Sequence, residues 1–162
     1  MKPITQENSR LGFVGIGYMG RPIARRLLES GFKLTAYDRN HANAEELIPC
    51  GGDVAQSIAE LSSSCDVVLS SLPSDEAVLD VYRGQGILTN TSRGSLLIDL
   101  STVYPDISRQ AVDAARSFQT LDSSQVAGLL TKTPQAAEAG QFEFYKTTHQ
   151  FDGTYANPQW PS

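Results

Sequence analysis

The sequence predicts an α/β domain built on a doubly wound, mostly parallel sheet, with an irregular C-terminal tail. Two observations lead to this prediction. Short apolar runs typical of buried strands alternate with segments of helical periodicity over most of the chain. The first run, residues 11–14, leads directly into a glycine-rich turn and then a helix. With 162 residues, of which 40% are hydrophobic and 19% charged, the chain is long enough to bury one globular core.

The glycine-rich turn has the spacing Gly15-x-Gly17-x-x-Gly20. Gly15 allows a tight turn out of the strand, Gly17 allows the backbone to approach a pyrophosphate, and Gly20 allows the helix to pack closely on the strand. The phosphates would lie on the free N–H groups at the positive end of this helix. The intervening residues are expected to bind the same cofactor: Ile16, Tyr18 and Met19.

On its own, this spacing also fits a glycine-rich turn without a ligand, so the residues that follow matter. Helical spacing of apolar residues starts at once, Pro22 falls in the first turn, and Gly31 ends the helix. Residues 32–38 then predict a second strand that ends in Asp38. Asp38 lies 23 residues after Gly15, close to the ~20 expected for a carboxylate that binds the adenosine ribose. Together these features predict a dinucleotide site of the Rossmann type.

Two neighbouring residues bear on which dinucleotide binds. Asp38 favours NAD over NADP, because a carboxylate accepts hydrogen bonds from ribose hydroxyls and repels a 2′-phosphate. Arg39 weakens that preference, since its guanidinium could pair with the phosphate. The predicted cofactor is therefore NAD, with NADP as the alternative.

The segments around this first unit are less regular. Residues 40–48 predict a short helix capped by Asn40, and residues 54–61 predict another helix that ends at three serines. Residues 1–9 form a polar leader that we expect to be loose.

Two further strands are predicted, each followed by a helix. Residues 66–72 form a β-branched run that stops at Pro73, and Ser74 caps the helix after it. The buried side of that helix is expected to comprise Ala77, Val78, Val81 and Tyr82. A turn-rich link over residues 84–94 precedes the strand at residues 95–100.

The last predicted helix starts at Pro105. Its apolar face is expected to comprise Ile107, Ala111, Ala114, Ala115 and Phe118. Residues 120–127 predict a further strand. Because no strand or helix period continues beyond residue 140, we expect a single domain over residues 10–140 and a tail over residues 141–162.

Charge and composition exclude several classes of partner. The net charge of −5 argues against nucleic acid, because phosphate binding needs clustered Lys and Arg. The one group of neighbouring basic residues is expected to form a solvated helix face: Arg21, Arg25 and Arg26. No apolar run approaches the length of a membrane span, and the N-terminus lacks a signal-peptide core.

The cysteines and histidines suggest no metal site. Cys50 and Cys65 fit no metal-ligand spacing, so we expect two reduced thiols in a cytoplasmic protein. His41 and His149 have no partner in the sequence and are expected at the surface.

Three stretches resemble the β-hydroxyacid dehydrogenases, the family of 3-hydroxyisobutyrate and 6-phosphogluconate dehydrogenases. Gly-Phe-Val-Gly-Ile-Gly-Tyr-Met-Gly-Arg-Pro-Ile-Ala, at residues 12–24, is similar to the opening of that family. Ser71-Leu72-Pro73 resembles its Leu-Pro loop, which touches the cofactor. The resemblance implies that these three loop residues bind the cofactor here.

The third stretch is Asp99-Leu-Ser-Thr102, followed by Pro105. It resembles the Asp-x-Ser-Thr-x-x-Pro motif of the family, in which the Ser-Thr pair lies beside the nicotinamide and the substrate. The resemblance implies a cofactor contact for Thr102 and substrate contacts for Ser101 and Thr102. The alternative is that Ser101 and Thr102 cap the helix that begins near Pro105.

The resemblance weakens after the predicted domain's last helix. Residues 122–128 keep only part of the family's Asp-x-Pro-Val-Ser-Gly-Gly segment, which binds the substrate carboxylate, and residues 136–140 resemble the small-residue segment that follows. Lys132 and Lys146 lack the Gly-x-x-x-Lys-x-x-Asn-Asn surroundings of the family's catalytic lysine. We therefore assign no catalytic residue and expect a chain that is truncated before the catalytic helical domain.

The sequence thus predicts the NAD(P)-binding domain of a 3-hydroxyacid dehydrogenase-like oxidoreductase, catalytically incomplete by itself. A small hydroxy-acid substrate is doubtful for this chain alone. Apolar surface left uncovered by the absent domain would favour a homodimer or a poorly soluble protein. Two alternatives stay open: a working small reductase with a shortened substrate site, and a non-enzymatic dinucleotide-binding or assembly module.

Overall fold

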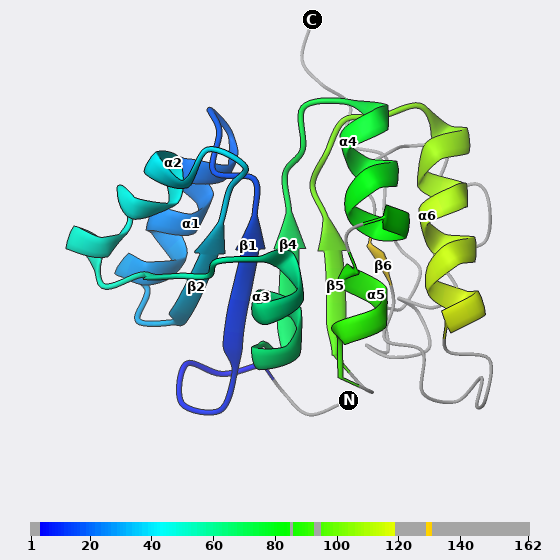
Figure 1. Ribbon diagram of the computed structural model, residues 1–162. Coiled ribbons are helices and arrows are strands. Elements are labelled where there is room, and N and C mark those ends of the chain that lie inside the picture. The colour runs from blue at the N-terminus through cyan, green and yellow to red at the C-terminus, as the bar shows by residue number, and fades with distance from the viewer. Residues whose placement is uncertain (1–3, 85, 93–94, 119–128, 131–162) are drawn as a thin grey trace, which may run out of the picture.

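A parallel sheet forms the centre of the molecule in the computed structural model, which describes residues 4–84, 86–92, 95–118 and 129–130 (Figure 1). Its strands are β1 (Arg10–Val14), β2 (Lys33–Tyr37), β3 (Asp53–Val54), β4 (Val67–Ser70), β5 (Leu96–Asp99) and β6 (Leu129–Leu130). They lie in the order β3-β2-β1-β4-β5-β6, and all five adjacent pairs are parallel. This is the strand order of doubly wound sheets that bind dinucleotides. The predicted fold class is confirmed.

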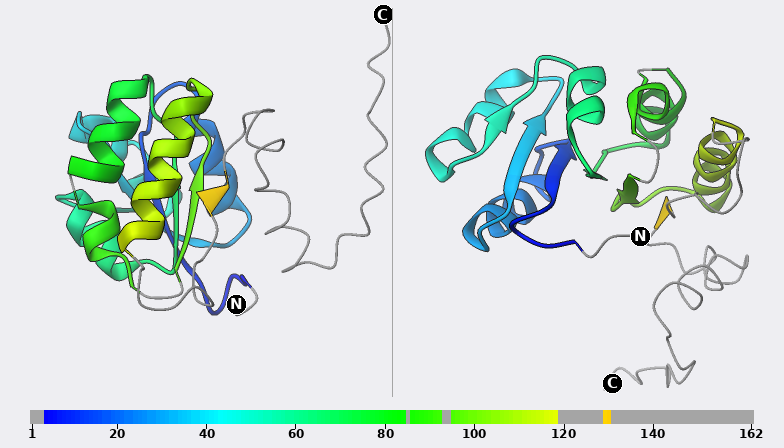
Figure 2. Two further views of the ribbon diagram at one scale, coloured as in Figure 1. Left: turned by 90° about the vertical axis from the view of Figure 1, so that its right-hand side faces the viewer. Right: turned by 90° about the horizontal axis from the view of Figure 1, so that it is seen from below.

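Helices cover both faces of this sheet. They are α1 (Gly20–Glu29), α2 (His41–Glu45), α3 (Ile58–Ser64), α4 (Asp75–Leu79), α5 (Ile87–Asn90) and α6 (Pro105–Phe118), with a 3-10 turn η1 (Ile48–Cys50) and a π-helical turn η2 (Asp80–Gly84). Figure 2 shows α3, α4 and α6 on the face opposite α1. The carboxyl ends of β1, β2, β4 and β5 meet at the upper edge of the sheet in Figure 1.

Two apolar cores follow from the alternation of side chains along the strands. In β1, Leu11 and Phe13 pack with α1 and α2, whereas the neighbouring Val14 packs in the core on the opposite face. The second core includes Tyr82 and Ile87, both of which are almost fully buried. No helix among the described residues is long and apolar enough to cross a bilayer.

The predicted helix over residues 54–61 is wrong at its start. Val54 lies in β3, a two-residue strand that pairs with β2, and α3 begins at Ile58. A strand this short cannot show an alternating pattern, and its apolar residue also fits the helical period of the segment after it. The three serines at residues 62–64 lie inside α3 rather than ending it, and the buried Ser62 hydroxyl donates to the Ile58 carbonyl at 2.7 Å.

Two more expectations need correction. The predicted helix over residues 40–48 divides into α2 and η1, and the turn-rich link over residues 84–94 contains α5. A helix of four residues is too short to show a 3.6-residue period, but its Ile87 is fully buried and fixes it on the core. The predicted strand at residues 120–127, and the tail at residues 141–162, lie outside the described residues.

The leader is ordered over the residues that the structure describes. The Ser9 N–H donates to the Thr5 carbonyl at 3.0 Å, and the Ser9 hydroxyl accepts from the Thr5 N–H at 3.2 Å. The Gln6 side chain donates to the Ser30 carbonyl at 2.6 Å. These hydrogen bonds hold residues 4–9 against the end of α1, so the expectation of a loose leader is wrong there.

The predicted basic face of α1 holds for two of its three members. Arg25 and Arg26 are exposed, but Arg21 is half-buried and pairs with Glu46 at 2.8 Å, which ties α1 to the end of α2. His41 is also half-buried rather than a free surface residue, because its ring packs edge-on against Tyr37 at 5.8 Å between centroids.

Ser74 caps α4 as predicted, with its hydroxyl accepting from the Ala77 N–H at 3.2 Å. We expect Ser74→Ala to lower the free energy of unfolding by about 1 kcal/mol, because that N–H loses its partner at the helix start. Ser63→Ala is the matched control: Ser63 is exposed and donates to the Glu60 carbonyl within α3, so its loss should change stability by less than about 0.5 kcal/mol. Urea denaturation of both variants checks this, and equal losses would contradict the cap.

Candidate functional site

The glycine-rich turn joins β1 to α1 at the carboxyl edge of the sheet. Gly15 has φ +93°, and a Cβ there would overlap the carbonyl oxygen of Ser71. A Cβ at Gly20 would overlap the carbonyl oxygen of Gly15. Both neighbours are backbone atoms that cannot move aside, so Gly15 allows the turn and Gly20 allows the close approach of helix and strand.

Gly17 differs from its two neighbours in the motif, because a Cβ there would meet no protein atom within 4 Å. The absence of a side chain leaves open space above this backbone. Behind it, α1 begins after Met19 without a side-chain cap and without an acidic residue in its first turn. By contrast, Ser57 and Ser74 cap α3 and α4. The uncapped N–H groups and the positive end of α1 suit an anion such as a pyrophosphate.

Asp38 follows β2 and is fixed beside this turn by the protein itself. One carboxylate oxygen accepts from the Ile16 N–H at 2.7 Å, and the other accepts from the Asn40 N–H at 2.8 Å and the Asn43 side chain at 3.1 Å. A carboxylate can accept about four hydrogen bonds, so about one position is left for a ribose hydroxyl. Asn40 occupies the N-cap of α2, as predicted, but its side chain forms no cap hydrogen bond.

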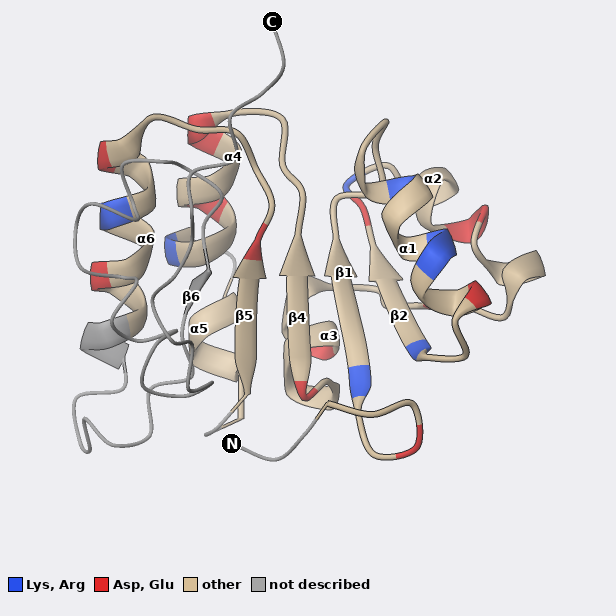
Figure 3. Cartoon of the chain, turned by 180° about the vertical axis from the view of Figure 1, so that it is seen from behind, with Lys and Arg blue, Asp and Glu red and all other residues tan. Residues whose placement is uncertain are grey.

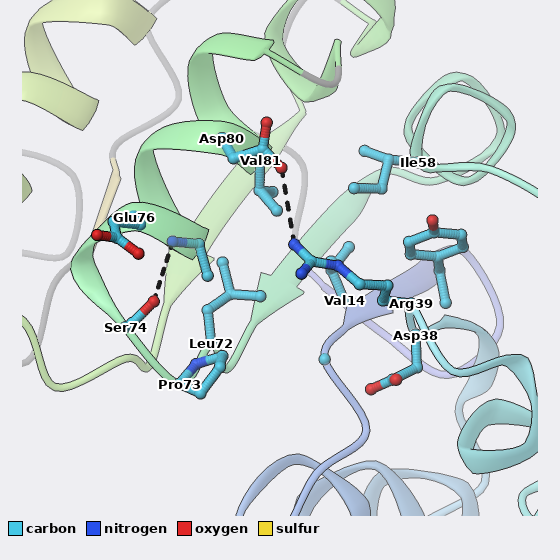
Figure 4. Close-up of a pocket in the computed structure, with 13 residues that line it drawn as sticks. Val14, Asp38, Arg39, Ile58, Leu72, Pro73, Ser74, Glu76, Asp80 and Val81 are labelled. Atoms are coloured by element: carbon cyan, nitrogen blue, oxygen red, sulfur yellow. Dashed lines mark hydrogen bonds and ion pairs between the residues drawn. The ribbon is translucent and has the colours of Figure 1, made fainter.

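A pocket of about 490 Å³ opens where these segments meet (Figure 4). It brings together three stretches that are far apart in the sequence and that were each predicted to bind a cofactor: Gly15, the pair Asp38 and Arg39, and the pair Leu72 and Pro73. The remaining lining residues were not predicted: Val14, Tyr37, Ile58, Ser74, Glu76, Ala77, Asp80 and Val81.

The other predicted cofactor residues are not among those that line this pocket: Ile16, Gly17, Tyr18, Met19, Gly20, Ser71 and Thr102. Tyr18 and Met19 are exposed at the start of α1, whereas the Ile16 side chain is fully buried and only its N–H faces Asp38. The Ser71 N–H donates to the Val14 carbonyl at 2.9 Å, which continues the β1–β4 pairing up to the pocket. The structure does not test whether these residues bind the cofactor, and their roles stay predictions.

Charged side chains line one wall of the pocket. The Arg39 guanidinium extends from the end of β2 toward η2, where its Nη2 lies 3.8 Å from an Asp80 carboxylate oxygen (Figure 4). Glu76 comes from the first turn of α4, one helical turn before Asp80. Figure 3 shows this acidic end of α4 at the carboxyl edge of the sheet. The four-residue spacing of Glu76 and Asp80, just after the predicted cofactor loop, is the sequence signal that points to this wall.

A buried chain of hydrogen bonds lies beneath the loops that follow β4 and β5. The hydroxyls of Ser70 and Ser101 both donate to one oxygen of Asp99, at 2.9 Å and 2.6 Å, and Asp99 is only 1% exposed. The Ser101 oxygen in turn accepts from the Leu72 N–H at 2.9 Å. Since the Ser70 hydrogen points to Asp99, the Tyr82 hydroxyl 2.9 Å away must donate to Ser70.

This network joins the Leu-Pro loop to the Ser-Thr segment. Burial, and then the nearby Asp99 carboxylate, raise the pKa of Tyr82, so its hydroxyl keeps the proton that the chain of donors requires. Ser101 is buried, and its hydroxyl bonds to Asp99 and Leu72 rather than to the start of α6, which disfavours the capping alternative. Thr102 is exposed at the same edge. Contacts of either residue with a substrate stay predictions.

The described residues contain no group of three His, Cys, Asp or Glu side chains that could hold a metal ion. Cys50 is half-buried and Cys65 buried, and both are free thiols. Burial raises the pKa of Cys65, which keeps that thiol protonated.

The fold and the site together define a dinucleotide-binding domain. The sheet has the required strand order, the glycine turn leads into an uncapped helix, and an acid is fixed at the end of β2. Residues 10–140 match the family described as the NAD binding domain of 6-phosphogluconate dehydrogenase, and the chain belongs to that family. It is therefore a domain that binds a nicotinamide dinucleotide.

Known relatives agree with this assignment. The mitochondrial 3-hydroxyisobutyrate dehydrogenase of Mus musculus is 40% identical over 101 residues, which are 62% of this chain and 30% of the mouse enzyme. A 3-hydroxyisobutyrate dehydrogenase of Mycobacterium tuberculosis, solved with L-serine, superposes with a TM-score of 0.65 at 27% identity, covering 76% of this chain and 38% of that one. Psf3, solved with NADP+ and 2-OPP, superposes with a TM-score of 0.63 at 29% identity, covering 75% of this chain and 40% of that one. The chain thus spans well under half the length of these relatives.

Proposed function

We propose that this chain supplies the cofactor-binding part of an oxidoreductase that transfers hydride between a nicotinamide and a small 3-hydroxy acid or semialdehyde. The observation that carries the proposal is the pocket in which the glycine turn, Asp38 and the Leu72-Pro73 loop meet. The M. tuberculosis relative supports the substrate class, because the L-serine bound to it is itself a 3-hydroxy acid.

The chain's own residues divide the binding between them in this proposal. The N–H groups at residues 17–20 hold the pyrophosphate, and Asp38 accepts from the adenosine ribose. Ser71, Leu72 and Pro73 contact the cofactor where β4 ends. Ser101 and Thr102 follow β5, and sheets of this kind bind ligands in the crevice outside the strand ends. There they would adjoin the nicotinamide, whose ring carries the transferred hydride when the cofactor is bound.

NAD is the favoured dinucleotide in this proposal, because Asp38 would repel a 2′-phosphate. Calorimetric titration of the chain with NAD+ and NADP+ tests both the binding site and the preference for NAD. We expect binding of both cofactors, with the lower Kd for NAD+. No binding of either would overturn the site, and tighter binding of NADP+ would overturn the preference alone.

We further propose that the chain by itself does not turn over a hydroxy acid at a rate typical of its relatives. The resemblance calls for a lysine at the hydroxyl, and no described residue that lines the pocket is a lysine or histidine. General acid–base help usually contributes ~10²–10⁴-fold, so we expect a rate lower by about that factor.

Purified chain, NAD+ and a panel with 3-hydroxyisobutyrate and L-serine would test this proposal by NADH absorbance. Turnover at the rate of the mouse relative, measured beside it as the control, would instead support a complete small reductase. Cofactor binding without turnover by this chain is what we expect, and it also fits the alternative of a non-enzymatic dinucleotide-binding module.

Self-association and location complete the proposal. Large apolar or aromatic side chains are exposed at the carboxyl edge: Tyr18, Met19 and Tyr104. We expect them to be covered in a homodimer, and a monodisperse monomer in light scattering would contradict this.

The two free thiols support a reducing compartment such as the cytoplasm. Fractionation of cells would check this location, since the mouse relative is described as mitochondrial.

A further inference from the structure

The charges that line the pocket are unbalanced. Of its lining residues, three carry a carboxylate and one carries a cation: Asp38, Glu76, Asp80 and, opposed to them, Arg39. Glu76 and Asp80 come from α4 and η2, a segment that lies outside the dinucleotide fingerprint. A π-helical turn begins at Asp80, and turns of this kind are frequent at functional sites.

Arg39 is the one lining residue that could pair with a 2′-phosphate. Its side chain is 83% exposed, yet it reaches across the pocket mouth, where its Nη2 lies 3.8 Å from the Asp80 carboxylate (Figure 4). Asp80 is 45% exposed, so this ion pair is at the surface and open to competition by another anion.

A 2′-phosphate would add a charge of about −1.5 to −2, as a phosphate monoester does in water near neutral pH. To gain Arg39 as a partner, it would have to displace Asp80, and it would then lie near three carboxylates. A 2′-hydroxyl carries no charge and faces neither cost. From this geometry we propose that Asp80 is a specificity-determining residue: by holding Arg39 it favours NAD over NADP. The inference rests on the proposed binding of the dinucleotide in this pocket.

The charge of Asp38 contributes to the same preference, but it does not determine what Arg39 can bind. The two oxygens of Asp38 already accept hydrogen bonds from Ile16, Asn40 and Asn43, which fixes it as a ribose acceptor. Whether an adjacent arginine can still accommodate NADP depends on what else holds that arginine. In this chain the Asp80 carboxylate competes for it.

Asp80→Asn tests the inference, because it removes the charge and keeps the shape. We expect the ratio of the NADP+ Kd to the NAD+ Kd to fall about three-fold at low salt, because a change of that size matches the free energy of an exposed ion pair. The shift should shrink at high ionic strength. Glu29→Gln is the matched control: it removes an exposed pair, Arg26–Glu29 at 3.5 Å, on α1 outside the pocket lining, and should leave the ratio unchanged.

A double-mutant cycle with Arg39→Gln tests the route through Arg39. In that background Asp80→Asn should lose at least half of its effect on the ratio. The inference would be overturned if Asp80→Asn left the ratio of the two Kd values unchanged, or if its effect on that ratio persisted in full in the Arg39→Gln background. In either case, cofactor binding by the wild-type chain would still support the site. If the wild-type chain binds neither cofactor, both the inference and the proposed function fail.

Discussion

Replacing Gly17 by valine is expected to weaken the binding of NAD and NADP alike by roughly a hundredfold, without destabilising the fold. A side chain at this position would stand in the open space above the turn and keep a pyrophosphate away from the first N–H groups of α1. Losing two hydrogen bonds between these N–H groups and the charged phosphates, at ~1.5 kcal/mol each, corresponds to about two powers of ten in Kd. Calorimetric titration and thermal unfolding of the variant measure the two effects.

The matched control is the same substitution at Gly20. There the new side chain overlaps the Gly15 carbonyl, so Gly20→Val should lower Tm or prevent folding. The contrast separates a glycine required by the ligand from one required by the fold. A Gly17→Val variant that binds NAD as the wild type does would show that the phosphates lie elsewhere.

Replacing Asp99 by alanine is expected to be strongly destabilising. The side chain is buried and accepts three hydrogen bonds, from the Ser70 hydroxyl and from the Ser101 hydroxyl and N–H. Its removal leaves those donors buried without an acceptor, at ~1–3 kcal/mol each, so we expect a loss of at least ~3 kcal/mol. With a urea dependence of ~1–3 kcal/mol per molar, the midpoint should fall by about 1 M or more.

Asp99→Asn tests the cause, because the amide keeps an oxygen and nearly the same volume. We expect this variant to lose clearly less stability than Asp99→Ala. Asp53→Ala provides an exposed control in β3 and should stay within about 0.5 kcal/mol of the wild type. Equal midpoints for Asp99→Ala and the wild type would show that the network does not stabilise these loops.

The fold could be predicted because its signals are local and long. The glycine turn, the apolar strands and helices of ten or more residues each leave a pattern in their own sequence, as α1 and α6 do. The missed elements, β3 and α5, have two and four residues, and tertiary packing rather than their own period fixes them. Ile87, for example, is held by the core that it enters.

The site could be predicted only in part, for a related reason. Gly15, Asp38, Leu72 and Pro73 belong to motifs with a fixed spacing. Asp80 does not, and its place in the site depends on how α4 and η2 pack beside the end of β2. The contact between Ser101 and Leu72 joins residues 29 apart, so no local pattern reveals it.

The structure of the chain with NAD bound is the measurement that tests the central claim most directly. We expect the pyrophosphate on the N–H groups at residues 17–20, an adenosine ribose hydroxyl within hydrogen-bond distance of Asp38, and the nicotinamide ring beside Thr102. A dinucleotide bound away from the glycine turn, or a nicotinamide far from Thr102, would contradict it.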